Sequence, residues 1–163
     1  MQNKDILFRE EDGVFSYRVA GVLIRDKKIL LHRFEEDPGY AFPGGHVNYG
    51  EESAQGLIRE FKEEINADIL PVRLLWVGEN FFPWDRRLCH QLCLYYQVQL
   101  QNAGQLPQGD EFLAMEQLDG QQFRLKYSWV PLDDLDAISI YPTNAKAFLQ
   151  NPSQEVRHFV YHQ

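Results

Sequence analysis

Basic residues are scarce in this chain. Its 16 Lys and Arg residues stand against 24 Asp and Glu residues, which gives a formal net charge of −8 at pH 7. This balance argues against docking on nucleic acid, because binding to a phosphate backbone needs clustered Lys and Arg to displace counterions. An acidic protein that handles smaller phosphate compounds needs added cations.

Cysteines and long apolar runs are also scarce. The two cysteines are Cys89 and Cys93, and their spacing on a predicted strand puts both on one face, some distance apart. We predict reduced thiols in a cytoplasmic protein. The first ten residues hold no apolar run, and no stretch reaches the roughly 18 apolar residues of a membrane helix, so we expect neither a signal peptide nor a membrane span.

The length and apolar content suit one core. The chain has 163 residues, of which 44% are hydrophobic and 25% charged, and no linker or internal repeat divides it. We predict a single domain over residues 1–163.

Apolar periodicity predicts strands grouped around one strong helix. Helical spacing of apolar residues predicts a helix over residues 52–65. Strands are predicted over 15–24 and 28–34, which form a hairpin, over 69–77, 91–100 and 123–130, and at an edge over 156–161, with short helices over 132–135 and 144–149. The polar stretch 101–122 is long for a plain connection and predicts a functional or mobile loop. This order favours a mixed sheet between helices.

The strongest chemical pattern is Gly45-His-Val-Asn-Tyr-Gly-Glu51, followed after seven residues by Arg59-Glu60-Phe61-Lys62-Glu63-Glu64. Six specified residues, each at roughly one position in fifteen, coincide by chance about once in 10⁷ starting positions. The pattern resembles the Nudix box, which continues with glycine and a large aliphatic residue where this chain has Asn66 and Ala67. Asn tolerates the left-handed conformation that ends a helix, so the first departure is conservative, whereas the second costs packing.

The resemblance implies a fold and a chemistry. The fold is α/β (α+β), a Nudix-type α/β/α sandwich with a mixed sheet. The chemistry is metal-dependent hydrolysis of the diphosphate linkage in a nucleoside diphosphate joined to another moiety: a nucleotide sugar or ADP-ribose, a nucleoside triphosphate, or a dinucleoside polyphosphate. Glu60, Glu63 and Glu64 are then the metal ligands, helped by the Gly45 carbonyl, and Mg²⁺ is the expected cofactor with Mn²⁺ as the alternative.

Helix geometry supports this assignment independently of the family. With Glu60 at 0°, Glu63 falls at about −60° and Glu64 at about 40°, beside an apolar face at about 100° to 160°. These carboxylates repel one another by roughly 0.2 to 0.5 kcal/mol per pair and lie where the helix dipole disfavours negative charge. Hard oxygen ligands that converge in this way suit Mg²⁺ or Mn²⁺.

The loop before the helix completes the predicted site. We expect Arg59 to pair with Glu51 and pin the loop to the helix, and to support catalysis with Glu60 and Glu63. Gly56 inside the helix costs roughly 1 kcal/mol relative to Ala, which a close approach of the loop backbone would explain. The glycines of Pro43-Gly44-Gly45 allow the loop to reach metal and phosphates.

The general base and the substrate contacts stay open at this stage. Glu60 or Glu63 can accept the proton of the attacking water, and the loop candidates are Asp110, Glu111, Glu116 and Asp119. Predicted substrate-binding residues are Gly44, Gly45, His46, Phe42 and Phe82, with Tyr40, Phe81 and Trp84 as further rings able to stack on a base and Glu79 and His90 as further polar residues near the cleft. Zinc at Cys89, His90 and Cys93 is disfavoured, because a fourth ligand is missing and adjacent strand residues face opposite ways.

Two other functions compete with hydrolysis. One is a non-catalytic nucleotide- or metabolite-binding sensor on the same fold, against which the complete set of Glu60, Glu63 and Glu64 argues. The other is an interaction protein whose acidic helix binds a basic partner, which predicts no response to Mg²⁺. The expected partner is a small nucleotide-type substrate, with no membrane or nucleic acid, and the assembly is open between monomer and homodimer.

Overall fold

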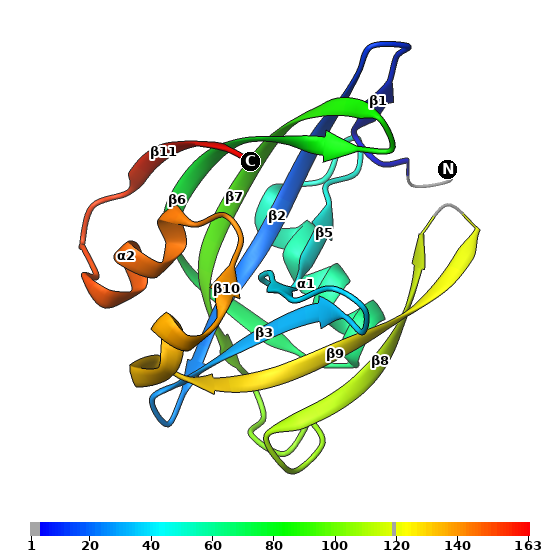
Figure 1. The fold of residues 1–163 in the computed structure, drawn as a ribbon. Helices are drawn as coiled ribbons and strands as arrows, with labels where there is room; N and C mark the ends of the chain where they lie inside the picture. The colour runs from blue at the N-terminus through cyan, green and yellow to red at the C-terminus, as the bar shows by residue number, and fades with distance from the viewer. Residues whose placement is uncertain (1–3, 119) are drawn as a thin grey trace.

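The computed structural model describes residues 4–118 and 120–163. Its elements in chain order are β1 (Leu7–Arg9), β2 (Gly13–Arg25), β3 (Lys28–Phe34), β4 (Gly39–Tyr40), β5 (Gly44–His46), α1 (Ser53–Ile65), β6 (Ile69–Trp84), β7 (Arg87–Leu100), β8 (Glu111–Leu118), β9 (Gln121–Pro131), the 3₁₀ helix η1 (Leu132–Ala137), β10 (Ser139–Ile140), α2 (Asn144–Gln150) and β11 (Arg157–His162). Figure 1 shows these elements along the chain.

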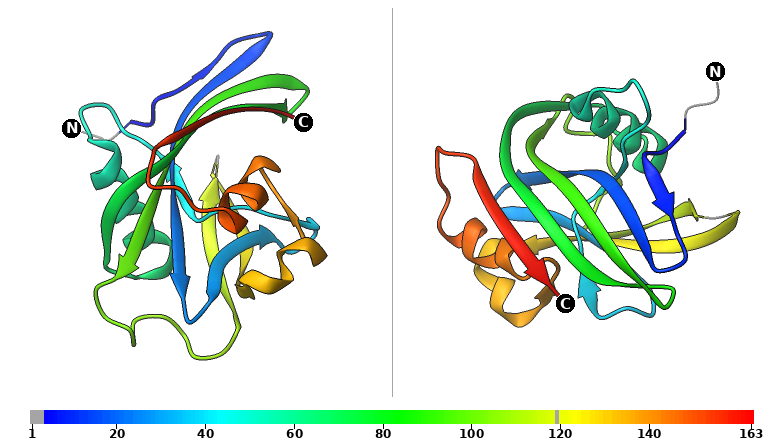
Figure 2. Two further views of the ribbon diagram at one scale, coloured as in Figure 1. Left: turned by 90° about the vertical axis from the view of Figure 1, so that its left-hand side faces the viewer. Right: turned by 90° about the horizontal axis from the view of Figure 1, so that it is seen from above.

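A mixed sheet organises the described residues. Nine of their strands belong to it, in the order β11-β6-β7-β2-β3-β9-β8, with β1 and β5 also paired to β2. The β2–β7 and β11–β6 pairs are parallel, and the other pairs of this sheet are antiparallel. Figure 2 places α1 on one side of the sheet and α2 on the other, which confirms the predicted sandwich.

Each side of the sheet has its own hydrophobic core. On the α1 side, Leu57 and Phe61 pack among buried residues that include Tyr127. The Phe61 ring reaches the sheet because Gly21 has no side chain there, and a Cβ on Gly21 would lie 2.8 Å from that ring. On the α2 side, Trp76, Tyr95 and Phe159 belong to the second cluster. Two cores on opposite faces keep the central strands buried.

Most predicted elements are present. The predicted hairpin is β2–β3, and its turn residues Asp26 and Lys27 have φ of 52° and 61°. The predicted helix is α1, and Asn66 ends it in the left-handed conformation with φ 52° and ψ 37°. The two short helices and the edge strand are also found, as η1, α2 and β11.

Two strands are longer than predicted, and one prediction was wrong. β6 continues to Trp84 and β7 begins at Arg87, so the two form a long hairpin that turns at Asp85 and Arg86 with φ of 47° and 64°. The predicted loop 101–122 contains β8, which pairs with β9 along eight positions. The alternation there of half-buried Ala114 and Glu116 with exposed Met115 is a strand pattern that acidic composition conceals.

Among the described residues, no helix has both the length and the apolar content that crossing a bilayer requires.

Candidate active site

Two glycines hold the loop against the sheet and the helix. Gly44 and Gly45 lie on β5, which pairs with β2. A Cβ on Gly44 would lie 2.0 Å from the Val19 carbonyl oxygen, so only glycine allows this crossing of backbones. A Cβ on Gly45 would lie 2.2 Å from the carboxyl carbon of Glu60. The loop backbone and the α1 carboxylate are therefore in direct contact.

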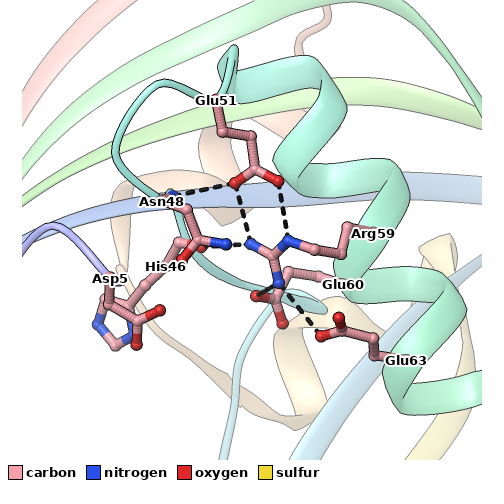
Figure 3. Close-up of polar contacts among 7 residues, drawn as sticks. All are labelled: Asp5, His46, Asn48, Glu51, Arg59, Glu60 and Glu63. Carbon is pink, nitrogen blue, oxygen red and sulfur yellow. Dashed lines mark hydrogen bonds and ion pairs between the residues drawn. The ribbon is translucent and has the colours of Figure 1, made fainter. Parts of the chain in front are cut away.

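Arg59 joins the loop to α1, as predicted (Figure 3). Its Nε and one terminal nitrogen donate to the two carboxylate oxygens of Glu51 at 2.8 and 3.0 Å, and that nitrogen also donates to the His46 carbonyl at 2.9 Å. Its other terminal nitrogen donates to Glu60 at 2.6 Å and to Glu63 at 3.2 Å. One guanidinium thus orients three carboxylates of the box.

Glu51 closes the loop at its other end. It accepts a hydrogen bond from the Asn48 N–H at 2.9 Å, and the Arg59 hydrogen bond holds its pKa below the usual value. Gly56 is needed because a Cβ there would lie 2.9 Å from a Glu51 carboxylate oxygen. The expected close approach therefore exists, but the Glu51 side chain makes it rather than the loop backbone.

Three half-buried glutamates, Glu60, Glu64 and Glu116, form an acidic group. Burial raises the pKa of Glu60, Glu64 and Glu116, and for Glu64 the nearby carboxylates of Glu116 and Glu60 raise it further. The Tyr127 hydroxyl donates to Glu64 at 3.0 Å, and Glu116 on β8 is hydrogen-bonded to Glu64. Glu63 differs, because its side chain is 61% exposed. Charge on this group is costly unless a cation balances it.

Besides Arg59, a second cation, Arg18, lies close enough to Glu64 and Glu116 to interact with them, and it had no predicted role. It lies on β2, and its guanidinium donates to the Phe42 carbonyl at 3.3 Å. Burial lowers its pKa, but Cys93, Glu64 and Glu116 outweigh burial and raise it. The available signal was a charged residue within the otherwise apolar, buried run of β2.

These donors fit a divalent cation. The acidic residues supply hard carboxylate oxygens, and the charges of Glu116 and Glu60 raise the pKa of Glu64, which is the electrostatic condition that a bound cation relieves. Among the described residues no group of three such side chains is already gathered in ligating positions. Arg59 accounts for this, because it holds Glu60 and Glu63 on its own nitrogens. Arg59 bonds only one oxygen of each carboxylate, Oε1 of Glu60 and Oε2 of Glu63.

A cavity of about 750 Å³ opens beside the acidic group. Of the predicted substrate-binding residues, it is lined by Phe42, Gly45, His46 and Phe82, together with Tyr40 and Trp84. Gly44 is not in the lining. The strand face of β6 and β7 decides which neighbours reach it: Asn80 and Gln91 do, whereas Glu79, Phe81 and His90 lie on the opposite face. There Glu79 contacts His158, and the Phe81 ring stacks on His162.

Polar residues that were not predicted also line the cavity. Asn80, Gln91 and Tyr95 form a polar wall on β6 and β7, whereas His32 comes from β3. Two of the four buried polar atoms that lack a partner among the described residues belong to this set, namely Asn80 Oδ1 and His32 Nδ1. Burial, helped by Arg18, lowers the pKa of His32 to about 3, so its imidazole is neutral.

The predicted loop acids differ in whether they line the cavity. Asp110 pairs with Lys28 at 2.7 Å and Glu111 with Lys126 at 3.0 Å, both outside the cavity. Glu116 lines the cavity. Asp119 lies outside the described residues.

The thiols are free and buried, as predicted. Burial raises the pKa of Cys89 and Cys93 to about 11 in each case. His90 faces the other side of the sheet, where its ring packs on Phe81. The arrangement gives no zinc site.

Known proteins were compared with this chain. The NUDIX domain family matches residues 16–151. YjhB of Bacillus subtilis (strain 168), whose name places it provisionally among the ADP-ribose pyrophosphatases, is 39% identical over 62 residues, which are 38% of this chain and 30% of YjhB. The match therefore spans under a third of that relative.

Solved structures share the fold. An ADP-ribose pyrophosphatase from Streptococcus suis 89-1591 has a TM-score of 0.59 at 16% identity, over 88% of this chain and 98% of the other. A MutT protein from Bacillus halodurans has a TM-score of 0.61 at 13% identity, over 90% of this chain and 89% of the other. The family match extends well beyond the box and covers most of the chain, so the chain belongs to the NUDIX domain family.

Proposed function

We propose that this Nudix hydrolase cleaves the diphosphate linkage of a nucleoside diphosphate joined to a second group, with Mg²⁺ or Mn²⁺ as cofactor. The observation that carries the proposal is the position of the acidic group. Glu60, Glu63 and Glu116 line the same cavity as Arg18, so metal ligands and a phosphate-binding cation meet in one concave site.

In this proposal, Glu60, Glu63, Glu64 and the Gly45 carbonyl hold the metal, and Glu116, on β8, lies beside Glu64. When bound, a divalent cation neutralises phosphate oxygens and lowers the pKa of the attacking water. Arg18 binds the diphosphate, because its guanidinium faces the cavity and is positively charged. Arg59 keeps the carboxylates in position through the bonds it makes to Glu51 and the helix.

Glu116 is the preferred general base. Of the acids predicted outside the box, it is the described one that lines the cavity. Burial raises its pKa, and a carboxylate with a raised pKa accepts a proton from water more readily near neutral pH. Glu60 and Glu63 are the alternatives within the helix.

A nucleoside diphosphate sugar such as ADP-ribose is the preferred substrate. Two proteins similar to this chain carry ADP-ribose pyrophosphatase in their names. The cavity of about 750 Å³ is within the size range of small-molecule sites and extends from the acidic group to a polar wall. A non-catalytic sensor is the second candidate and is disfavoured, because the carboxylates and the Arg59 contacts are all present.

The test is hydrolysis of a panel containing ADP-ribose, UDP-glucose, nucleoside triphosphates and dinucleoside polyphosphates, with Mg²⁺ and with chelator. Glu63→Gln is compared with Glu52→Gln, which removes an exposed carboxylate at the start of the same helix. We expect one compound class to be cleaved, and both chelation and Glu63→Gln to lower the rate by about 10²-fold or more while Glu52→Gln leaves it unchanged. Full activity of Glu63→Gln or in chelator would overturn the mechanism. A panel that is bound but never cleaved would favour the sensor.

A further inference from the structure

A row of four polar side chains runs across the sheet, and three of them, Asn80, Gln91 and Tyr161, line the cavity. Strand register places Ser16 opposite Gln91, Gln91 opposite Asn80, and Asn80 opposite Tyr161. Direct cross-strand partners share one face of a sheet, so these four side chains form a line over β2, β7, β6 and β11. We call them the polar row. Three of them are almost fully buried, with exposures of 0% for Ser16, 3% for Asn80 and 8% for Tyr161.

The amide of Asn80 is held in one orientation by its neighbours. Its nitrogen donates to the Gln91 side-chain oxygen and to the Tyr95 hydroxyl, both at 3.1 Å. Tyr95 is hydrogen-bonded in turn to Cys93, so its hydroxyl has partners on both sides. Both N–H groups of Asn80 are therefore engaged, and its oxygen is the atom left without a partner among the described residues.

This arrangement leaves an acceptor beside a donor. Asn80 Oδ1 is buried and unpaired, which costs free energy unless a ligand supplies a donor. Gln91 uses its oxygen to accept from Asn80, so its N–H groups point elsewhere and remain donors. A ligand that complements the pair must present a donor and an acceptor side by side in one plane.

The surroundings favour a flat, uncharged ligand. Arg18 is two residues beyond Ser16 on the same face of β2, at the acidic end of the cavity, whereas no Lys or Arg belongs to the polar row. Rings of Phe42 and Phe82 also line the cavity. Because β2 and β6 are two strand spacings apart, Asn80 lies about 10 Å across the sheet from the strand of Arg18.

From these observations we propose that Asn80 and Gln91 recognise the edge of a nucleobase. The base lies on the floor of the cavity while its phosphate is held by Arg18. Every nucleobase presents a ring or amino N–H beside a ring nitrogen or carbonyl oxygen, which matches the unpartnered acceptor of Asn80 and the donor of Gln91. The inference rests on the proposed function for the position of the phosphate, and it assigns the nucleoside half of the substrate to the β6–β7 wall.

The test measures binding without hydrolysis. Nucleoside monophosphates contain no anhydride, so calorimetric titration with AMP, UMP, GMP and CMP in Mg²⁺ reports binding even if the protein is not catalytic. Ribose 5-phosphate and glucose 1-phosphate are the ligands without a base. The variants are Asn80→Leu and Gln91→Leu, and Gln99→Leu is the matched control, because it removes an amide from an exposed position on β7.

We expect wild type to bind at least one nucleoside monophosphate about tenfold or more tightly than ribose 5-phosphate, and both cavity variants to remove that preference while ribose 5-phosphate affinity is unchanged. Gln99→Leu should behave as wild type. Gln91 is only partly buried, so Gln91→Leu carries the test if Asn80→Leu fails to show a cooperative melt.

Three results would overturn the inference. They are equal wild-type affinity for nucleoside monophosphates and ribose 5-phosphate, an undiminished preference in the folded variants, or an Asn80-dependent affinity for glucose 1-phosphate, which would assign the wall to a sugar. None of these depends on turnover. A protein that binds bases through Asn80 without cleaving the hydrolysis panel would refute the proposed function alone.

Discussion

Glu64 shows how a single residue differs here from an ordinary helix glutamate. It is held between the Tyr127 hydroxyl and the carboxyl of Glu116, and burial raises its pKa. An exposed Glu at this position would ionise freely. The chain tolerates the cost because the same carboxyl is a proposed metal ligand, and sites that bind ions are where such penalties persist.

His32 makes a prediction about pH and stability. Its pKa is about 3 in the folded protein and 6.5 in the absence of burial, so between those values the unfolded chain binds a proton that the folded chain does not. Above about pH 6.5 His32 is neutral in both states, and the free energy of unfolding is at its full value. As the pH falls below this value, the unfolded chain gains a proton and the free energy of unfolding decreases. We expect wild type to lose about 1.4 kcal/mol per pH unit more than His32→Gln in the middle of this window, measured by urea unfolding between pH 6.5 and 4.5.

His162→Gln is the control for that comparison, because it removes an imidazole from an exposed position. Parallel pH profiles for wild type and His32→Gln would contradict the prediction and place the His32 imidazole in contact with water.

Local spacing explains which site residues could be predicted. Gly45, Glu51, Arg59 and the helix glutamates are close in sequence, so their pattern was visible before the fold. Arg18, Asn80 and His32 lie on three different strands and meet only through sheet register. An isolated Asn or His in an apolar strand carries no local signal, and only pairing shows which face it occupies.

At the scale of elements, the C-terminal end of α1 depends on a backbone conformation that few residues tolerate. The helix stops at Asn66, whose N–H bonds the Lys62 carbonyl at 3.1 Å, and the Ala67 N–H bonds the Phe61 carbonyl at 3.2 Å. This closure needs the left-handed conformation, and it turns the chain so that Ala67 is fully buried under the helix.

The end of α1 gives a second prediction. Asn66→Ala should destabilise the protein by about 1 kcal/mol, because Ala in the left-handed region costs roughly that much, whereas Asn66→Gly should match or exceed wild type. The measurement is urea unfolding followed by circular dichroism. Asn151→Ala is the control, since Asn151 ends α2 with φ −128°. Equal losses in Asn66→Ala and Asn66→Gly would mean that the Asn side chain, not its backbone conformation, matters.

Elements were predicted best where one periodicity extends over a whole segment. The α1 helix and the β2–β3 hairpin meet that condition. β8 does not, because Glu116 occupies an inward position while Leu113 and Met115 occupy outward positions with exposures of 55% and 54%. In the proposed function, Glu116 belongs to the acidic group of the site. The strand that sequence reasoning missed is thus the one that brings a site residue from outside the box.

At the scale of the molecule, stability and metal binding oppose each other. The raised pKa of Glu116 means that ionising it costs stability above the usual carboxyl range. We expect Glu116→Gln to raise the melting temperature of chelator-treated protein, and to raise it more at pH 8 than at pH 5. The same variant should hydrolyse substrate more slowly. It should also show a smaller upward shift in melting temperature with Mg²⁺ than wild type does. Thermal melts with and without Mg²⁺ check all of these.

Glu111→Gln provides the control, because Glu111 is an exposed carboxylate on the same strand. If Mg²⁺ raises the melting temperature of Glu116→Gln as much as that of wild type, Glu116 does not contribute to Mg²⁺ binding.

The family and the mixed sheet were predictable for the whole molecule, because the box is specific and its helix needs a sheet to cover. The family match covers residues 16–151, so one domain over all 163 residues stays a prediction, as do the choice of Mg²⁺, a cytoplasmic setting and the homodimer. These depend on surroundings that a single chain does not contain.

The two walls of the cavity belong to different limbs of the sheet, and β2 connects them. It pairs with β7 at eleven positions and with β3 at two, Ile24 with Ile29 and Arg25 with Lys28. The polar row lies on the first limb, whereas Glu116 and His32 lie on the second. The two limbs are therefore joined along β2 and β3 by only two residue pairs, and none of those four residues lines the cavity.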